Sequence, residues 1–368
     1  MERFQIQAVS DHTIAEAADF LCRWHTDTRS NSSAQGTIYQ DGEKLKKHLS
    51  WLLLANPLGA SSLQHGFCIR GSSGMVVGLI LCFPNAFLFE DRRLQGLCSG
   101  SFFVEQSARM QGFYLFKKYL NNSSSDFYFG TTCNAISGAL WKKVGGLSVP
   151  HSEKNYILPL KLEAVLPQFV ARKTPSKTAS RIARFLGYLA KPLIQLGLSR
   201  GPDLATEPCE DWQKLSEIFH RHRNRSWITT DRSPEFLKWR YGPGSPNPKA
   251  EIYWFRDKRG NEGWFALARA AGGNGGQIRG ALLLDAVWPR DKLEFKQLLP
   301  AILRRPMVRM ADALFLHPRL GVNFRDCSAL ILARPLPAPR AFAITRKGNP
   351  PIDVSKLDLV PADGDSAF

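Results

Sequence analysis

Long hydrophobic runs are missing from this 368-residue sequence. The longest apolar stretch, residues 75–83, is short and contains Gly78, whereas a membrane-spanning helix needs about 20 apolar residues. The first residues, Met1–Gln5, also lack the apolar core of a signal peptide. We therefore expect no transmembrane helix and predict a cytoplasmic protein.

Paired cysteine motifs are also missing. The seven cysteines are odd in number and include no Cys-x-x-Cys spacing, which excludes a zinc-ribbon or thioredoxin signature. Their neighbours, such as Leu21 beside Cys22, are mostly apolar. We expect buried, unpaired cysteines and no metal site.

Acidic residues are scarce beside basic ones: 32 Asp and Glu face 49 Lys and Arg, giving a formal net charge of +17. The composition is otherwise that of a globular protein, with 44% hydrophobic and 22% charged residues. The positive charge is compatible with nucleic acid, an anionic membrane surface or an anionic substrate as partner, and also with a basic surface that binds nothing.

The order of predicted elements indicates two α/β domains. Residues 1–165 alternate between helical and strand patterns and end in a strand at 156–162, which is typical of a mixed sheet flanked by helices. Residues 203–346 repeat this order, including a last strand at 328–333, without obvious sequence identity. The Pro- and Asp-rich residues 347–368 are predicted to form a flexible tail.

Residues 166–202 differ from both domains. Seven basic residues and no acidic residue lie between Arg172 and Arg200. Apolar residues recur there at helical spacing, which predicts an amphipathic helix: Ile182, Phe185, Leu186, Leu189, Leu193 and Leu196. This helix is either a linker packed between the domains or a peripheral contact of residues 176–198 with an anionic membrane surface.

Residues 101–114 form the first stretch that could carry chemistry. A strand is expected to end near Val104, and a helix is expected to begin near Gln111. The backbone N–H groups of Arg109–Gly112 would then lie at a helix N-terminus, where a pyrophosphate can bind, and Gly112 would let the phosphates approach. An ordinary strand-to-helix turn is the alternative.

The second stretch, residues 134–146, is predicted to be a helix capped by Asn134 and ended by Gly145. Capping alone explains Asn134.

Together, and in this order, the two stretches resemble the Gcn5-related N-acetyltransferase superfamily. The first matches that family's acyl-CoA motif at Val104, Arg109 and Gly112, and the second matches the following motif at Asn134, Ser137, Leu140 and Gly145. The sequence departs from the two motifs at four positions: Gln106 replaces a proline, Tyr114 a small residue, Trp141 a tyrosine and Gly146 a phenylalanine.

The resemblance covers residues 1–165. Trp51 and the run Trp239-Arg240-Tyr241 also resemble double-domain members of the superfamily. The implied fold is α/β (α+β), with two tandem acyl-CoA N-acyltransferase-like domains, each a mostly antiparallel mixed sheet flanked by helices.

The resemblance implies a binding site for acetyl-CoA or another acyl-CoA. The pantetheine arm would lie in a gap between the strand ending at Val104 and the strand near 129–131. The expected contact residues are Phe103, Val104, Arg109, Met110, Gln111, Gly112, Phe113, Tyr114, Asn134 and Ser137.

The implied chemistry is direct attack of an amine on the thioester. The backbone N–H of Val104 would stabilise the oxyanion, and Glu105 is the candidate base; an exposed loop carboxylate is the alternative for Glu105. Trp141 has only an indole N–H and cannot act as the general acid. Cys133 has no evident histidine beside it and is interpreted as a buried residue rather than a nucleophile.

The second half carries fewer signals. Asp285 follows a predicted strand, but no Arg-x-x-Gly follows it, so a second acyl-CoA site is not expected. This half would form the acceptor side, with Trp239, Arg240, Tyr241 and Asp285 binding the acceptor. Aromatic packing is the alternative for the Trp-Arg-Tyr run.

The leading hypothesis is therefore an acyl-CoA-dependent N-acyltransferase, and more narrowly an acetyltransferase. Its acceptor would be a small amine, phosphorylated or sugar-linked, such as an amino sugar or nucleotide-linked sugar in polysaccharide synthesis. The alternatives are a tRNA-dependent aminoacyl transferase of the double-domain type and a non-catalytic binding protein with a decayed site. Nucleic acid is not the expected partner of the amphipathic helix, since few aromatic residues lie among its basic ones. The oligomeric state stays open.

Overall fold

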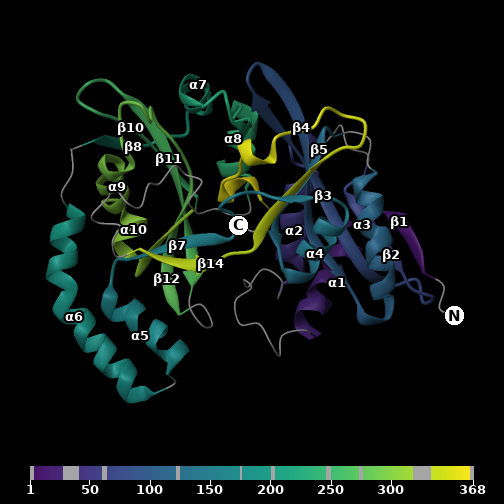
Figure 1. Cartoon of the computed structure of the whole chain (residues 1–368), viewed down its shortest axis with the longest axis horizontal. Coiled ribbons are helices and arrows are strands. Elements are labelled where there is room, and N and C mark those ends of the chain that lie inside the picture. The colour runs from purple at the N-terminus through teal and green to yellow at the C-terminus, as the bar shows by residue number, and fades with distance from the viewer. Residues whose placement is uncertain are drawn as a thin grey trace. The chain divides into compact units, whose positions relative to one another are not determined.

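The computed structural model describes residues 4–27, 41–59, 64–121, 125–174, 176–199, 204–245, 250–272, 277–317 and 333–364. The chain divides into two compact units. The first unit consists of Met1–Glu153, Asn224–Pro248 and Pro339–Phe368, and the second of Lys154–Arg223 and Lys249–Ala338. Each unit contains one mixed sheet with helices packed against it, as the sequence predicted (Figure 1).

Among the described residues of the first unit, nine strands form one sheet. Its main order is β1 (Gln5–Ala8), β2 (Gly66–Arg70), β3 (Val76–Phe89), β4 (Arg92–Val104), β5 (Phe127–Cys133), β15 (Arg340–Thr345) and β6 (Leu147–Ser148). Along this order all neighbours are antiparallel except β4 and β5, which run parallel. Two short strands extend it: β9 (Ile228–Thr230) pairs with β3, and β16 (Leu357–Asp358) pairs with β9.

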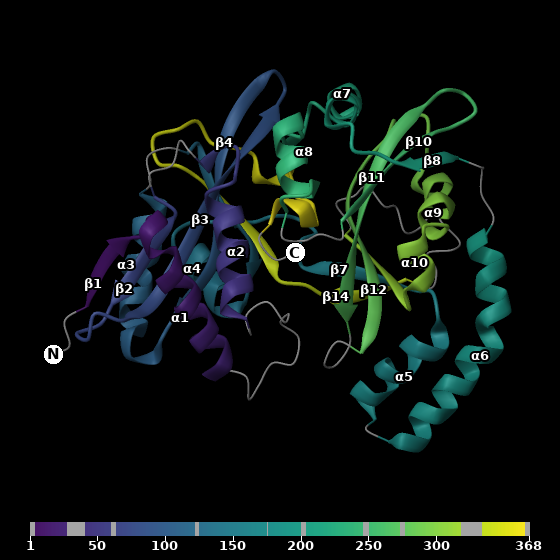
Figure 2. The ribbon, with the colours of Figure 1, turned by 180° about the vertical axis from the view of Figure 1, so that it is seen from behind.

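Helices cover both faces of this sheet (Figures 1 and 2). They are α1 (Ile14–Asp27), α2 (Gly42–Leu53), α3 (Gly112–Leu120) and α4 (Ala135–Lys143), with α8 (Pro234–Tyr241) in the same unit. Side chains alternate between the faces along a strand. Phe102 and Val104 of β4 pack against the cluster that contains α3 and α4, whereas Phe103 contacts Trp24 of α1.

The second unit repeats this architecture. Its sheet has the order β14 (Arg334–Pro337), β7 (Lys154–Pro159), β13 (Ala313–Leu316), β12 (Ile278–Val287), β11 (Glu262–Gly272), β10 (Glu251–Arg256) and β8 (Ala205–Pro208). Its helices are α5 (Leu162–Lys173), α6 (Lys177–Ser199), α7 (Trp212–His222), α9 (Phe295–Leu303) and α10 (Pro306–Met310). Among the described strands of this sheet, β12 and β13 form the one parallel pair.

The two halves of the chain exchange a strand. By their place in the sheet, strands β1 to β5 of the first sheet correspond to β8, β10, β11, β12 and β13 of the second. The neighbour of β5 is then β15, from the end of the chain, and the neighbour of β13 is β7, from the first half. The strand predicted at 156–162 therefore exists as β7, but it belongs to the second sheet. The first segment of the first unit accordingly ends at Glu153 and not at the predicted residue 165. A strand's apolar pattern specifies its buried face and not its neighbour, so the sequence could not show this exchange.

Residues 224–248 were predicted in the second domain and lie in the first unit. They are held there by a reciprocal tryptophan pair. The Trp51 indole Nε1 donates to the carbonyl of Trp239, and the Trp239 Nε1 donates to the carbonyl of Trp51, each at 3.0 Å. The two rings also stack, with their centroids 4.9 Å apart. The predicted linker segment, with α5 and α6, belongs to the second unit.

The predicted flexible tail is wrong for residues 347–364, which pack into the first unit. Leu357 is buried, and Asp363 forms an ion pair with Arg232 at 2.8 Å, with both side chains buried. The amide of Asn85 donates to the Asp363 carbonyl at 3.1 Å. The Pro and Asp residues thus form turns and a buried ion pair. The strand predicted at 328–333 falls almost entirely outside the described residues.

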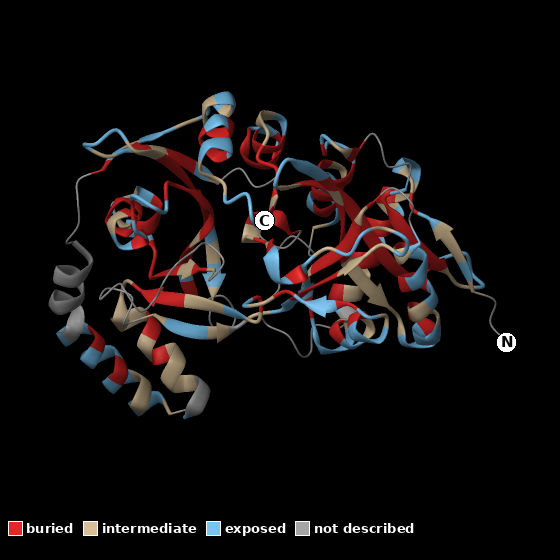
Figure 3. Cartoon of the chain, turned by 45° about the horizontal axis from the view of Figure 1, so that its top comes forward, coloured by how far each residue is buried: buried red, intermediate tan, exposed pale blue. Residues whose placement is uncertain are grey.

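The buried residues of each unit lie between its sheet and helices (Figure 3). Among the described cysteines, Cys68, Cys82, Cys98 and Cys133 are buried, as predicted, and burial raises the pKa of the Cys82 thiol to about 12. In the part of the chain that the structure describes, no helix has the length and apolar character needed to cross a bilayer.

His48 of α2 gives the first unit a pH dependence. Burial, with the Arg240 guanidinium nearby, lowers the pKa of His48 from 6.5 to about 4. Between these values the unfolded chain binds a proton that the folded protein does not, so stability is full above pH 6.5 and falls as the pH drops towards 4. The loss should reach about 3 kcal/mol.

Urea unfolding of wild type and His48→Gln between pH 7 and pH 4 measures this loss, which the variant should lack. His12→Gln, at an exposed histidine, should retain it. Equal slopes of stability against pH in wild type and His48→Gln would contradict the assignment.

Candidate functional site

The candidate site is the place where β4 and β5 separate. The two strands pair in parallel from Gly96 and Phe127 as far as Ser99 and Gly130. Beyond this point β4 continues to Val104 paired with β3 alone, and β5 continues to Cys133. The side chains at 101–104 are half-buried. A sheet whose two central strands diverge leaves one edge of β4 open to a ligand that can hydrogen-bond to the backbone.

A bulge in β4 begins at the same point. Leu79 pairs with Phe103 while Leu81 pairs with Gly100, so β4 holds one residue more than β3. Ser101 has a φ of 48°, in the left-handed region that few residues other than glycine adopt. Bulges bend a strand and redirect its side chains and are common beside functional sites. No pattern in the sequence predicted this bulge.

The bulge and pairing also set the direction of the Val104 N–H. The N–H of Glu105 donates to the carbonyl of Val77 on β3 at 2.8 Å. Successive N–H groups of a strand point to opposite sides. The N–H of Val104 therefore points away from β3, towards the gap, where the predicted oxyanion donor should be.

The helix after β4 begins earlier than predicted. A 3₁₀ helix, η4, spans Gln106–Gln111 and continues into α3, and the Gly112 N–H donates to the Arg109 carbonyl. The predicted set of free N–H groups at Arg109–Gly112 is thus wrong, since these residues lie inside a helical run. Gly112 instead packs on β4: a Cβ there would lie 3.4 Å from Val104 Cγ2.

Positive charge gathers around Phe113 at the start of α3. The Lys117 and Lys143 ammonium groups, from α3 and α4, lie 4.8 and 4.9 Å from the centroid of the Phe113 ring. Arg109, Lys118 and Lys142 are exposed nearby in sequence, and neither α3 nor α4 contains a carboxylate. Met110 and Tyr114 are also exposed, by 84% and 58%. The surface around Phe113 is therefore cationic and carries exposed apolar groups, which suits phosphate and an aromatic base.

Asn134 acts as the cap of α4. Its Oδ1 accepts hydrogen bonds from the N–H groups of Ile136 and Ser137 at 3.0 and 2.9 Å, and the Ser137 hydroxyl donates to the same oxygen at 3.2 Å. Capping therefore uses this oxygen fully, and any contact of Asn134 or Ser137 with pantetheine stays a prediction.

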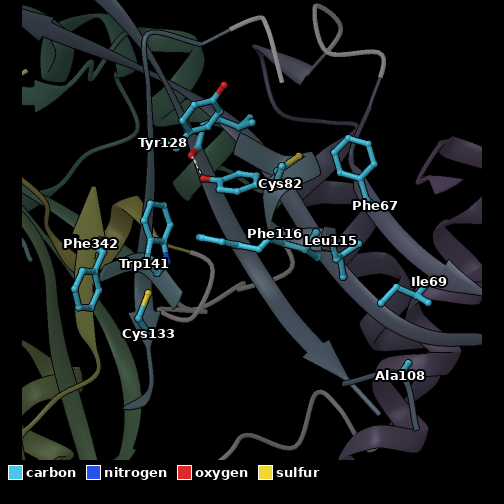
Figure 4. Close-up of a cluster of buried hydrophobic side chains, with 13 residues drawn as sticks. Phe67, Ile69, Cys82, Ala108, Leu115, Phe116, Tyr128, Cys133, Trp141 and Phe342 are labelled. Atoms are coloured by element: carbon cyan, nitrogen blue, oxygen red, sulfur yellow. Dashed lines mark hydrogen bonds between the residues drawn. The ribbon is translucent and has the colours of Figure 1, made fainter. Parts of the chain in front are cut away.

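Trp141 lies in the core and not at a surface. It is 1% exposed and packs against Phe116, at 5.1 Å between ring centroids, and Phe342, at 6.5 Å (Figure 4). The family that the sequence resembles has a tyrosine at this position. In this protein a buried hydrophobic side chain occupies it. Cys133, in the same cluster, is buried as well.

Glu105 follows β4 directly and is half-buried, so this residue lies where the open edge of β4 ends. Sequence reasoning missed a titratable group that contacts β4. His25 of α1 is 7% exposed, and its ring meets the Phe103 ring edge-on at 5.2 Å between centroids. The only sequence signal was its position at the end of an amphipathic helix.

Three of the four residues predicted to bind the acceptor, Trp239, Arg240 and Tyr241, are all buried. The Arg240 guanidinium donates to the Gly364 carbonyl and lies 5.3 Å from the Trp51 ring. Their described contacts hold α8 and the C-terminal segment against α2, so the packing alternative accounts for them.

Asp285 lies on β12 in the second sheet and is 3% exposed; its carboxylate accepts from the Ala286 N–H at 2.9 Å. Here too the parallel pairing ends early, at Leu282 and Phe315, and the strand contains an extra residue opposite β11. Residues 283–287, however, are all buried. The second sheet has the same strand geometry, but its continuing strand is buried.

Comparison with protein-family models finds no match, and neither does comparison with curated protein sequences. Solved structures do match. Saccharomyces cerevisiae N-myristoyltransferase with bound myristoyl-CoA aligns over 97% of this chain and 85% of its own, with a TM-score of 0.57 and 10% identity.

A GCN5-related N-acetyltransferase from Anabaena variabilis aligns over 94% of this chain and 73% of its own, with a TM-score of 0.53 and 11% identity. A GCN5-related N-acetyltransferase from Kribbella flavida covers 94% and 71%, with a TM-score of 0.50 and 10% identity. At these identities the likeness shows the fold, and it confirms the predicted acyltransferase-like architecture.

The burial of Trp141 predicts that it stabilises the fold. Replacing it with alanine should cost about 3–5 kcal/mol of unfolding free energy, because a large cavity opens in the core. Tyr114→Ala, at an exposed ring on α3, should change stability by less than about 0.5 kcal/mol. Urea unfolding measures both, and a Trp141→Ala variant as stable as Tyr114→Ala would show that Trp141 is not a core residue.

Proposed function

We propose that this protein is an acyl-CoA-dependent N-acyltransferase whose thioester binds where β4 and β5 separate. The observation that carries the proposal is the open edge of β4 beyond Ser99 and Gly130, with the Val104 N–H directed towards it. The shared fold supports it, since a yeast N-myristoyltransferase of that fold has been solved with myristoyl-CoA.

In this proposal the pantetheine arm takes the place of a strand. Its two amides would pair with the β4 backbone, which has lost its β5 partner after Ser99. The thioester carbonyl would then lie near the Val104 N–H, which stabilises the negative charge that forms on this oxygen during attack.

The reaction is a direct transfer. The acceptor amine forms a C–N bond to the thioester carbon, the C–S bond breaks, and CoA leaves as its thiolate. The amine must lose a proton, and Glu105 at the end of β4 is the proposed base. His25, whose ring contacts the Phe103 ring, is a second candidate for this role.

The leaving thiolate receives no proton from Trp141, because that side chain is buried and its N–H is not acidic. A thiol has a pKa near 8.5, so the thiolate is a good leaving group and can take its proton from water. The absence of a tyrosine at this position is therefore compatible with turnover.

The phosphates of CoA would be held by side chains rather than by the backbone set predicted from the sequence. Arg109, Lys117 and Lys143 provide exposed cations on three consecutive helical elements. Charge-assisted hydrogen bonds to phosphate are roughly twice as strong as neutral ones. Acetyl as the acyl group, and a phosphorylated or sugar-linked amine as acceptor, stay predictions from the sequence.

One alternative has a structural observation in its favour. A binding protein with a decayed site would keep the fold while losing the acid, and Trp141 in the core fits that description. Measured release of CoA thiol with any amine would exclude it.

Thermal unfolding with and without CoA and acetyl-CoA tests the proposal. A ligand that binds only the folded state raises the melting temperature, so both should raise it. In Arg109→Glu/Lys143→Glu the affinity should fall about tenfold or more, because two cations become anions facing phosphate.

The control is Lys258→Glu, a single charge reversal at an exposed turn of the second unit, which should bind CoA like wild type. If no CoA thioester shifts the wild-type melting temperature, the proposal fails. If the double variant binds as well as Lys258→Glu, the phosphate site lies elsewhere.

A further inference from the structure

Helix α6 exposes its large apolar side chains to solvent. Ile182, Phe185, Leu186 and Leu189 are exposed by 56%, 62%, 52% and 62%, and Tyr188 by 55%. The first four stand at i, i+3, i+4 and i+7, so they share one face of the helix. The described side chains of α6 are mostly at the surface (Figure 3).

Small residues make the contact that holds α6 in its unit. Ala183 and Gly187, one turn apart, are the buried positions between 181 and 189. A Cβ on Gly187 would lie 2.5 Å from the backbone nitrogen of Glu163 in α5, so the two helices touch backbone to backbone there. The usual arrangement of an amphipathic helix is reversed, with its large apolar residues facing outward, so the linker interpretation does not explain the apolar face.

A basic face lies beside the apolar one. Lys177, Arg181 and Arg184 are exposed, and at 3.6 residues per turn they fall together on the side of α6 next to Ile182 and Phe185. No acidic residue occurs from 164 to 202. The α6 surface (Lys177, Arg181, Ile182, Arg184, Phe185, Leu186, Tyr188 and Leu189) is thus apolar along one strip and cationic along the next.

We infer that the α6 surface docks the protein on a bilayer that contains anionic lipids. Apolar side chains on one face of a helix enter the boundary between headgroups and acyl chains, while basic side chains at its flank contact anionic headgroups. A helix of this kind lies in the plane of the membrane without crossing it, in keeping with the lack of a spanning helix among the described residues.

Other occupants fit the surface less well. A second copy of this chain would bring two strongly cationic segments together, at a cost in repulsion. RNA would match the charge and could stack on Phe185 and Tyr188, but it would leave the aliphatic strip of Ile182, Leu186 and Leu189 in contact with water. An anionic bilayer satisfies both the charge and the aliphatic strip.

Flotation of the full-length protein with lipid vesicles tests the inference. We expect binding to phosphatidylcholine vesicles that contain about one third phosphatidylglycerol, and much weaker binding to phosphatidylcholine alone. Phe185→Ser/Leu189→Ser should reduce the partition coefficient about tenfold or more, since two apolar side chains no longer enter the bilayer. Arg181→Gln/Arg184→Gln should reduce it about fivefold per charge, and only at low salt.

Leu147→Ser, at a 60% exposed residue of the first unit, should bind vesicles like wild type. All changed side chains are exposed, so circular dichroism should show unchanged melting temperatures. CoA binding, measured on the same samples, should be unaffected in every variant, which separates this test from that of the acyltransferase function.

Three results would overturn the inference. One is no binding to anionic vesicles. Another is equal binding by Phe185→Ser/Leu189→Ser and Leu147→Ser. The last is a wild-type dimer, seen by light scattering, that the serine pair converts to a monomer while vesicle binding is absent, which would assign the face to a second copy.

Discussion

Backbone hydrogen bonding at the divergence of β4 and β5 is the constraint on which the site depends. Inside a sheet every N–H and C=O needs a partner, and β4 loses one of its two partner strands beyond Ser99. The bulge at Ser101 and the half-buried side chains at 101–104 accompany this loss. A ligand with its own amides can supply the missing partner, and the pantetheine arm of CoA has two. The proposed chemistry follows from where this edge ends, at Val104 and Glu105.

Comparison of the two sheets sharpens the point. Each has a bulged central strand whose parallel partner leaves it early. In the second sheet the continuing strand, residues 283–287, is buried throughout, whereas in the first it is half-exposed. The same topology therefore gives one continuing strand that is half-exposed and one that is buried. The exchange of β7 and β15 gives each sheet a strand from the other half of the chain, so neither half of the sequence holds a complete sheet.

Sequence patterns predicted those features that depend on neighbouring residues. The strands and the cap at Asn134 arise from short-range spacing, and the architecture followed from them. The strand exchange and the Trp51–Trp239 pair depend on contacts between residues more than a hundred positions apart, which apolar periodicity does not encode. The start of η4 at Gln106 was missed because the helix begins without a side-chain cap. The apolar stripe of α6 was recognised, but only the structure shows that Ala183 and Gly187 make the buried contact.

The central claim is that the open edge of β4 receives a CoA thioester, and a crystal structure of the protein with CoA tests it most directly. We expect the pantetheine arm between β4 and β5 beyond Ser99 and Gly130, hydrogen-bonded to β4, with its sulfur close to the Val104 N–H. CoA bound at another surface of the protein, with none between β4 and β5, would contradict it.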